Sequence, residues 1–277
     1  MASTALFRIP AYFLCCMAAI GMAAQQPASS HARVELLAEQ ATAKLGSQVQ
    51  LGVHFVLESG WHIYWINPGD SGQSPSLKWQ LPPGFTAGEI QWPRPERMQP
   101  IPQLADFGYH DEVLLPVTLH VPASAKEGES VQIAADAKWL VCREVCIPEH
   151  SSLHLSLPVA ATAKEDPQSA PIFARTSKLL PKPMPHGWKV SARSRKDDFV
   201  LSVMAGKRIT KAEFFPLESG QIDNPAPQKV EPLATGIKIT LKKSDLLLKP
   251  IPVLRGVLAL PNGLAYTIEA PVRQSIQ

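Results

Sequence analysis

The chain has 277 residues, a formal net charge of +3 at neutral pH and 45% hydrophobic residues. This length is enough for two ordinary domains, and neither charge nor composition indicates a nucleic-acid-binding protein. The 27 prolines are scattered along the chain, which disfavours long helices and favours short strands joined by turns.

Residues 1–24 have the features of an export signal peptide. The amino terminus and Arg8 supply positive charge, and Ile9 to Ala19 is nearly all apolar. Small residues follow, so cleavage is expected after Ala23 or Ala24. The apolar stretch is shorter than a membrane-spanning helix requires, and an uncleaved anchor is the alternative.

Removal of this segment would leave a single pair of cysteines. Cys15 and Cys16 would be lost with the signal peptide, and Cys142 and Cys146 would remain. In an oxidising compartment one such pair is expected to form a disulfide, either structural or exchanging.

Residues 30–160 have the pattern of an all-β domain. Apolar residues nearly alternate with other residues from Val49 to Leu57, which predicts a strand with one buried face. A second strand is expected at 60–65, before the turn residues 67–70, and a turn is expected at 126–129. Further strands are expected at 113–121, 131–140 and 152–157. Strands at this spacing favour a β-sandwich.

The rest of the chain divides into a linker and a second domain. Residues 161–186 are rich in Ala, Pro, Lys and Ser, and we expect a linker with one short helix near 172–180. From 187 to 277 the β pattern resumes. Asn262-Gly263 between two apolar runs predicts a hairpin. We therefore expect an all-β protein with two β-sandwich domains in tandem.

The spacing of Cys142 and Cys146 restricts the backbone between them. Four residues of extended strand span roughly 13 Å, whereas a disulfide needs α-carbons within about 7 Å. The segment Arg143-Glu144-Val145 must therefore form a hairpin tip or a helical turn. A bridge that closes so small a loop removes little entropy from the unfolded chain, which favours a redox role over a purely structural one. The spacing is one residue longer than in thioredoxin.

A metal site is the other alternative for this region. Cys142, Cys146, His150 and His154 recur every fourth residue and could bind zinc or copper from one face of a helix. However, Pro148 would break such a helix, and residues 152–157 alternate like a strand. We therefore expect neither a metal nor another cofactor.

The residues around the pair resemble a known family. The segment from Trp139 to Glu149, with sequence WLVCREVCIPE, is similar to the active-site segment in the amino-terminal periplasmic region of DsbD-type protein-disulfide reductases, and is most similar to the ScsB branch. The stretches 60–72, 107–109 and 214–224 also resemble that family. This resemblance covers both expected domains and implies immunoglobulin-like folds.

The resemblance also implies roles for individual residues. Cys146 would form the mixed disulfide with a partner, and Cys142 would resolve it. A loop with an aromatic residue covers the pair in the family, and here that loop would be 106–109, with Phe107 as the shield. The other supporting residues that we expect in or beside the site are Asp106, Tyr109, His62, Tyr64 and Glu144.

The family further implies an electron path in the periplasm. Its cysteine pair receives electrons from a membrane-embedded domain and passes them to thioredoxin-like proteins. The family's usual architecture continues into that membrane domain, which the sequence up to Gln277 does not contain. We therefore expect a separate membrane-embedded donor and periplasmic thioredoxin-like partners. The alternatives are an adaptor module with a structural disulfide, and a copper or zinc carrier.

Overall fold

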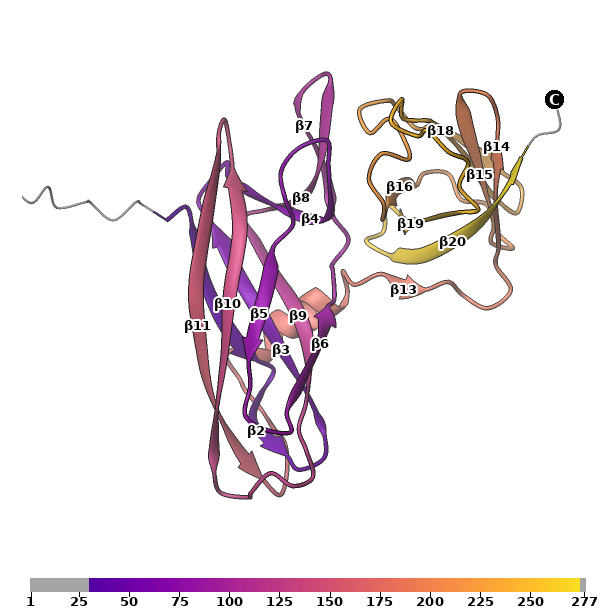
Figure 1. Cartoon of the computed structure of the whole chain (residues 1–277). Coiled ribbons are helices and arrows are strands. Elements are labelled where there is room, and N and C mark those ends of the chain that lie inside the picture. Colours follow the sequence, from indigo (N-terminus) through magenta and orange to yellow (C-terminus); the bar gives the residue numbers. More distant parts are fainter. Residues whose placement is uncertain (1–29, 275–277) are drawn as a thin grey trace, which may run out of the picture.

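The structure of the chain is a computed structural model that describes residues 30–274. The expected signal peptide, with Cys15 and Cys16, lies outside the described residues. Figure 1 shows an elongated β-sandwich on one side and a smaller β structure on the other, so the expected all-β, immunoglobulin-like architecture is confirmed. Within residues 30–274, no helix combines the length and apolar character needed to cross a membrane.

One sheet of the first sandwich has four antiparallel strands in the order β1-β3-β9-β6. These strands are β1 (Ala32–Ala38), β3 (Gln48–Leu57), β9 (Glu112–His120) and β6 (Thr86–Ile90). β3 is the strand whose alternation the sequence predicted. Its residues Val49, Leu51, Val53 and Phe55 are fully buried, because they face the second sheet across the core.

The second sheet of this sandwich follows the order β12-β2-β11-β10-β4-β8-β7, and β5 also pairs with β10. Its strands are β2 (Gln40–Lys44), β4 (His62–Gly69), β5 (Ser76–Gln80), β7 (Glu96–Ile101), β8 (Leu104–His110), β10 (Ser130–Cys142), β11 (Cys146–Ala160) and β12 (Lys164–Glu165). β10 and β11 form a long hairpin paired from Ser130–Pro158 to Cys142–Cys146.

The linker predicted from the sequence carries some regular structure. The helix α1 (Ala170–Ser177) begins two residues before the expected position, with Pro171 in its first turn. Its residues Phe173 and Thr176 are buried. The short strand β13 (Lys182–Pro183) then pairs with β20.

The second sandwich lies beside the upper part of the first (Figure 1). Its strands follow the order β16-β19-β20-β14-β15-β18-β17. They are β14 (Lys189–Ser194), β15 (Asp198–Met204), β16 (Glu213–Pro216), β17 (Lys229–Leu233), β18 (Gly236–Lys242), β19 (Val253–Ala259) and β20 (Ala265–Gln274). The hairpin predicted around Asn262-Gly263 is confirmed, with Ala259 opposite Ala265.

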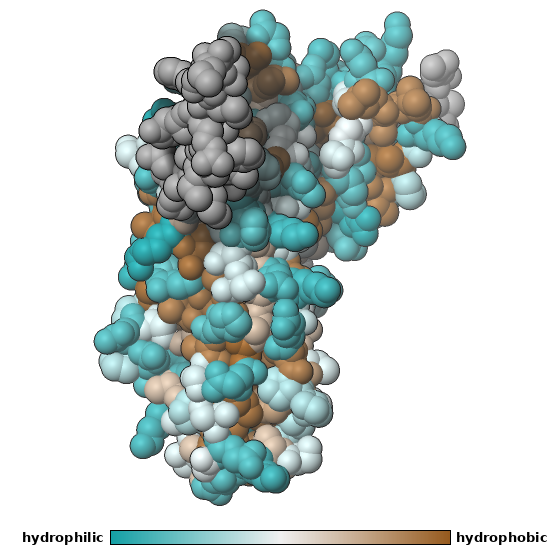
Figure 2. Space-filling model, turned by 60° about the vertical axis from the view of Figure 1, so that its left-hand side comes forward, coloured by the Kyte–Doolittle hydropathy of each residue, from teal (hydrophilic) through white to brown (hydrophobic). Residues whose placement is uncertain are grey.

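Two hydrophobic clusters form the cores of the sandwiches. They meet at β16, where adjacent residues point in opposite directions: Phe214 belongs to the second core, and Phe215 belongs to the first. The first core therefore includes residues from both sandwiches. On the face drawn in Figure 2, hydrophilic residues are spread over the surface, and hydrophobic ones form a broken strip along the lower part and further patches on the upper part.

Candidate functional site

The two cysteines lie at the tip of the β10–β11 hairpin. They face each other as the last pair of the ladder and form a disulfide, with α-carbons 4.2 Å apart. The reversal occurs through Arg143-Glu144-Val145, where the Arg143 amide donates to the Val145 carbonyl. The hairpin tip is thus the first of the two expected backbone arrangements. The strand register buries Cys142, which is 2% exposed, whereas Cys146 is exposed.

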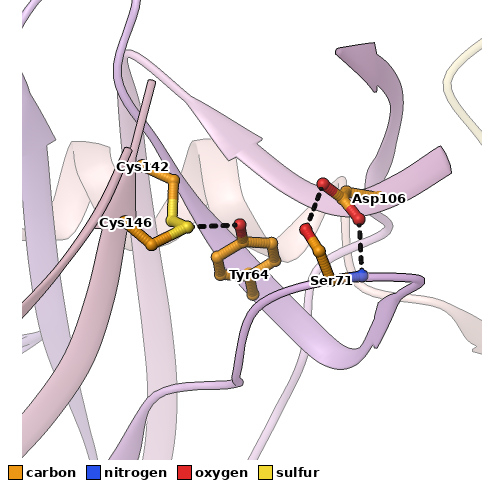
Figure 3. The surroundings of a disulfide bond; sticks show 5 residues. All are labelled: Tyr64, Ser71, Asp106, Cys142 and Cys146. Atoms are coloured by element: carbon orange, nitrogen blue, oxygen red, sulfur yellow. Dashed lines mark hydrogen bonds between the residues drawn. A yellow bond between two sulfur atoms is a disulfide. The ribbon is translucent and has the colours of Figure 1, made fainter. Parts of the chain in front are cut away.

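Strand β4 places two aromatic side chains beside the disulfide. His62 lies directly opposite Cys142 in the register, and two residues later Tyr64 points to the same face of the sheet. The Tyr64 hydroxyl lies 3.4 Å from the Sγ of Cys146 (Figure 3). Because a disulfide sulfur carries no proton, the phenol is the donor in this state.

The loop after β4 covers Tyr64. Its anchor is Asp106 of β8, whose carboxylate accepts hydrogen bonds from the backbone amide and the hydroxyl of Ser71, at 2.9 and 2.7 Å (Figure 3). Gly72 follows with φ +78°, and a β-carbon there would lie 2.1 Å from the Tyr64 ring. Only glycine allows the backbone to approach the ring so closely. The turn that the sequence predicted at 67–70 begins later than expected, because strand β4 continues to Gly69.

The electrostatics of the site favour neutral side chains next to the disulfide. Burial lowers the pKa of His62, the neighbouring His110 lowers this pKa further, and Asp106 opposes the shift. Burial raises the pKa of Tyr64, a hydrogen bond with Ser71 opposes this, and Asp106 raises the pKa further. At neutral pH the site therefore presents an uncharged phenol and an uncharged imidazole.

The segment predicted to be a covering loop is a regular strand. Residues 106–109 belong to β8, which pairs with β4 on one side and β7 on the other. Gly108 lies opposite Tyr64, and a β-carbon on Gly108 would meet the Ile63 carbonyl oxygen at 2.0 Å. The absence of a side chain at Gly108 therefore allows β8 to pack closely against β4.

Phe107 lies on the opposite face of β8 from Asp106 and Gly108. It is fully buried, and its ring packs edge-on against Phe215, with centroids 5.3 Å apart. The Arg97 guanidinium lies over the Phe107 ring. In this arrangement the cover over Tyr64 comes from Ser71 and Gly72, and Phe107 joins the two sandwiches.

Two further expected residues lie beside the site rather than in it. Tyr109 faces the core, its hydroxyl donates to the Pro93 carbonyl at 2.7 Å, and burial raises its pKa well above the ordinary value. Glu144 is exposed at the hairpin tip. Its neighbour Arg143 stacks its guanidinium over Trp61, 5.2 Å from the ring centroid.

Sequence comparison assigns the first sandwich to a protein family. Residues 33–158 match the sequence model of the family described as "Thiol:disulfide interchange protein DsbD, N-terminal". These residues form a DsbD-type N-terminal domain. The resemblance inferred from the sequence is thus confirmed, and the domain is a thiol–disulfide exchange module by family.

Structural comparison extends the likeness of fold beyond the DsbD-type domain. The N-terminal periplasmic domain of ScsB from Proteus mirabilis is 18% identical, with a TM-score of 0.66, and the alignment covers 90% of this chain and 96% of that one. The YadV chaperone aligns over 86% of this chain and 99% of its own, at 9% identity and a TM-score of 0.24, which is too low to compare folds. The comparison with curated protein sequences gave no match.

Sequence reasoning missed three residues around the disulfide of the DsbD-type domain. Ser71 and Gly72 fall within the family-like stretch 60–72, and their polar and flexible character was the available signal. His110 lies opposite His62, with ring centroids 5.6 Å apart. Nothing local in the sequence pointed to His110, because the two histidines are neighbours only through the pairing of β4 with β8.

The strand geometry also bears on the metal alternative. Cys146, His150 and His154 all lie in β11. Residues four apart on a strand share a face but are roughly 13 Å apart, too far to bind one ion together. Within residues 30–274, no group of three or more His, Cys, Asp or Glu side chains is arranged to hold a metal ion.

Proposed function

We propose that this protein is a periplasmic thiol–disulfide exchange protein that relays electrons through Cys142 and Cys146. A membrane-embedded donor would supply the electrons, and thioredoxin-like proteins would receive them. We also propose the division of the chain suggested by the sequence: a signal peptide at 1–24, the redox domain at 30–160, a linker at 161–186 and a second domain at 187–277.

The observation that carries the proposal is the unequal burial of the two cysteines. Cys146 is exposed at the hairpin tip, whereas Cys142 is 2% exposed. An incoming sulfur can therefore reach Cys146 far more easily than Cys142. This supports Cys146 as the residue that forms the mixed disulfide and Cys142 as the one that resolves it.

The exchange takes place in two steps. In the reduced protein, the Cys146 thiolate attacks one sulfur of the partner's disulfide, and the partner's other sulfur leaves as a thiolate and is protonated. The Cys142 thiolate then attacks the Cys146 sulfur and releases the partner's second sulfur. The partner gains two electrons, and the Cys142–Cys146 disulfide forms again.

Tyr64 has a defined part in these steps. Its neutral hydroxyl, 3.4 Å from the Cys146 sulfur, can donate a hydrogen bond to the thiolate. Hydrogen bonds to a charged acceptor are stronger than those to a neutral one, so the contact favours the reactive form of Cys146. The loop of Ser71 and Gly72 holds the phenol ring in place.

The proposal is tested by trapping. The variant Cys142→Ala keeps the exposed cysteine and should accumulate a mixed disulfide with a thioredoxin-like protein under mild oxidation. The matched variant Cys146→Ala should trap much less. If neither variant traps such a partner, the relay function is wrong.

The structural-disulfide alternative makes a different prediction. Bridges that serve only stability have reduction potentials below about −300 mV and resist exchange. The bridge here closes a loop of only three intervening residues, which limits its entropic effect on stability. Equilibration with glutathione buffers would distinguish the two functions.

A further inference from the structure

We propose that His62 accepts the proton of Cys142 when this buried cysteine resolves a mixed disulfide, and returns the proton when the disulfide is reduced. This inference rests on the proposed exchange function. It assigns a separate aromatic partner to each sulfur: Tyr64 to Cys146 and His62 to Cys142.

The strand register places His62 next to Cys142. The two residues are directly opposite each other where β4 meets the end of β10. Opposite residues in an antiparallel pair have β-carbons about 5 Å apart, which puts the thiol within reach of the imidazole. His62 is 7% exposed, so water has little access to this side of the pair.

One nitrogen of the His62 imidazole has no hydrogen-bond partner in the described part of the chain. The Nε2 atom of His62 is buried and has no hydrogen-bond partner among residues 30–274. A buried nitrogen without a partner costs free energy in the resting protein, and such exceptions often have a functional reason. A thiol formed by reduction of the disulfide would supply the missing donor.

The groups around His62 suit a reversible proton acceptor. The titratable groups that face it are Tyr64 on its own strand, His110 and Asp106 on β8, and Cys142 on β10. Burial and His110 lower the pKa of His62, so the ring is neutral and ready to accept a proton at neutral pH. Asp106 supplies the negative charge that stabilises the imidazolium once it forms.

The chemistry requires a base at this position. A buried thiol ionises less readily than an exposed one, yet only the thiolate attacks a disulfide. In the resolving step, the Cys142 proton moves to His62 Nε2, the thiolate bonds to the Cys146 sulfur, and the partner leaves as a thiolate. In the reducing direction, a donor thiolate attacks Cys146, Cys142 leaves as a thiolate, and His62 returns the proton.

The test uses oxidised glutathione as the disulfide and the variant His62→Gln. Mass spectrometry of acid-quenched samples separates the first step, which forms the Cys146–glutathione adduct, from the second, in which Cys142 resolves it. We expect the second step to slow by about 100-fold, as for loss of a general base, and the first step to change by less than about threefold. His150→Gln, at an exposed histidine in β11, is the matched control and should leave both rates unchanged.

The pH profile distinguishes a proton acceptor from a structural role. In the wild-type protein the resolution rate should rise with pH through a histidine-like midpoint below about 6.5. In His62→Gln the midpoint should move above about 8.5, to the range of a buried thiol. Added imidazole should partly restore the rate of His62→Ala. Equal rates and profiles in wild type and His62→Gln would overturn the inference.

Two further measurements, an NMR titration and the trapping experiment above, separate failure of this inference from failure of the variant to fold and from failure of the proposed function. If His62→Gln does not fold, NMR titration of His62 in the wild-type protein replaces it. The imidazole should titrate differently in the oxidised and reduced forms, and identical titrations would overturn the inference. If His62 controls glutathione resolution but no thioredoxin-like protein is trapped by Cys142→Ala, the relay to such partners is wrong, whereas the exchange chemistry at Cys142 and Cys146 and the role of His62 in it both stand.

Discussion

At the scale of single residues, the disulfide is asymmetric in both exposure and chemistry. Cys146 is exposed and has the hydroxyl of Tyr64 at 3.4 Å, whereas Cys142 is buried opposite His62. One sulfur is therefore open to a partner and can be stabilised as a thiolate. The other is shielded and adjacent to a group that can exchange protons.

Tyr64→Phe isolates the hydroxyl of this site. The ring and its packing remain, but the donor to the Cys146 sulfur is lost. We expect the pKa of the Cys146 thiol to rise by about one unit, since loss of such a hydrogen bond costs about 1.4 kcal/mol. Alkylation of the Cys142→Ala protein with iodoacetamide across a pH series measures the shift. Tyr266→Phe in the second sandwich should leave the profile unchanged, and an unshifted profile for Tyr64→Phe would contradict the role of the hydroxyl.

His62 also predicts how stability depends on pH. Its pKa is lower in the folded protein than the ordinary value of 6.5, so the unfolded chain binds a proton first as the pH falls. Protonation of His62 therefore leaves stability unaffected above about pH 6.5 and lowers it as the pH falls from there through the folded-state pKa. Urea unfolding of the oxidised protein at pH 5.5 and 7.5 should show a smaller difference for His62→Gln than for wild type. The same difference in both proteins would argue against a depressed pKa.

At the scale of elements, the site is the junction of a hairpin tip, strand β4 and the loop that follows β4. The hairpin places the two sulfurs together, and β4 brings the two aromatic rings to them. The loop of Ser71 and Gly72, held by Asp106, then covers Tyr64. Each element contributes only part of the site, so the site depends on their mutual register.

Gly72→Ala tests the contact of the loop with Tyr64. Alanine at φ +78° is strained, and its β-carbon would also clash with the Tyr64 ring at 2.1 Å. Gly187→Ala is the matched control, because its φ is +88° and no heavy atom lies within 4 Å of the added carbon. We expect urea denaturation to show a loss of about 1 kcal/mol for the control and about 2–4 kcal/mol for Gly72→Ala. Equal losses of stability in Gly72→Ala and Gly187→Ala would mean that the loop can move away from the Tyr64 ring without a loss of free energy.

At the scale of the whole molecule, the second sandwich contacts the segment that covers the site. Asn224 donates to the Asp70 carboxylate at 2.8 Å, and the Asn67 side chain donates to the Pro216 carbonyl at 2.8 Å. Phe215 packs edge-on against both Phe107 and Trp65. The two sandwiches thus share polar and apolar contacts next to the loop over Tyr64.

Phe215→Ala should weaken the contact between the two sandwiches. The side chain is 1% exposed and belongs to the first core, although β16 is part of the second sandwich. We expect a loss of about 3–5 kcal/mol and the appearance of two separate transitions in calorimetry. Phe214→Ala, one residue earlier on the opposite face, should destabilise the second sandwich without uncoupling the first. A single transition for Phe215→Ala would show that the contact is not what joins them.

The sequence by itself determined the features that depend on neighbouring residues. Period-two alternation in β3, the hairpin at Asn262-Gly263 and the chain reversal between Cys142 and Cys146 are all local consequences of residue type and spacing. The structure bears out each of them. The motif around the cysteines also indicates the family whose sequence model matches residues 33–158.

Only the tertiary structure decided which side chains meet at the disulfide. The pairing of β4 with β10 brings His62 to Cys142, and the pairing of β4 with β8 brings His110 to His62. The same register turns Phe107 away from Asp106, because neighbouring residues on a strand point to opposite faces. Contacts of this kind depend on how distant strands align, and a shift of one residue would exchange the two faces.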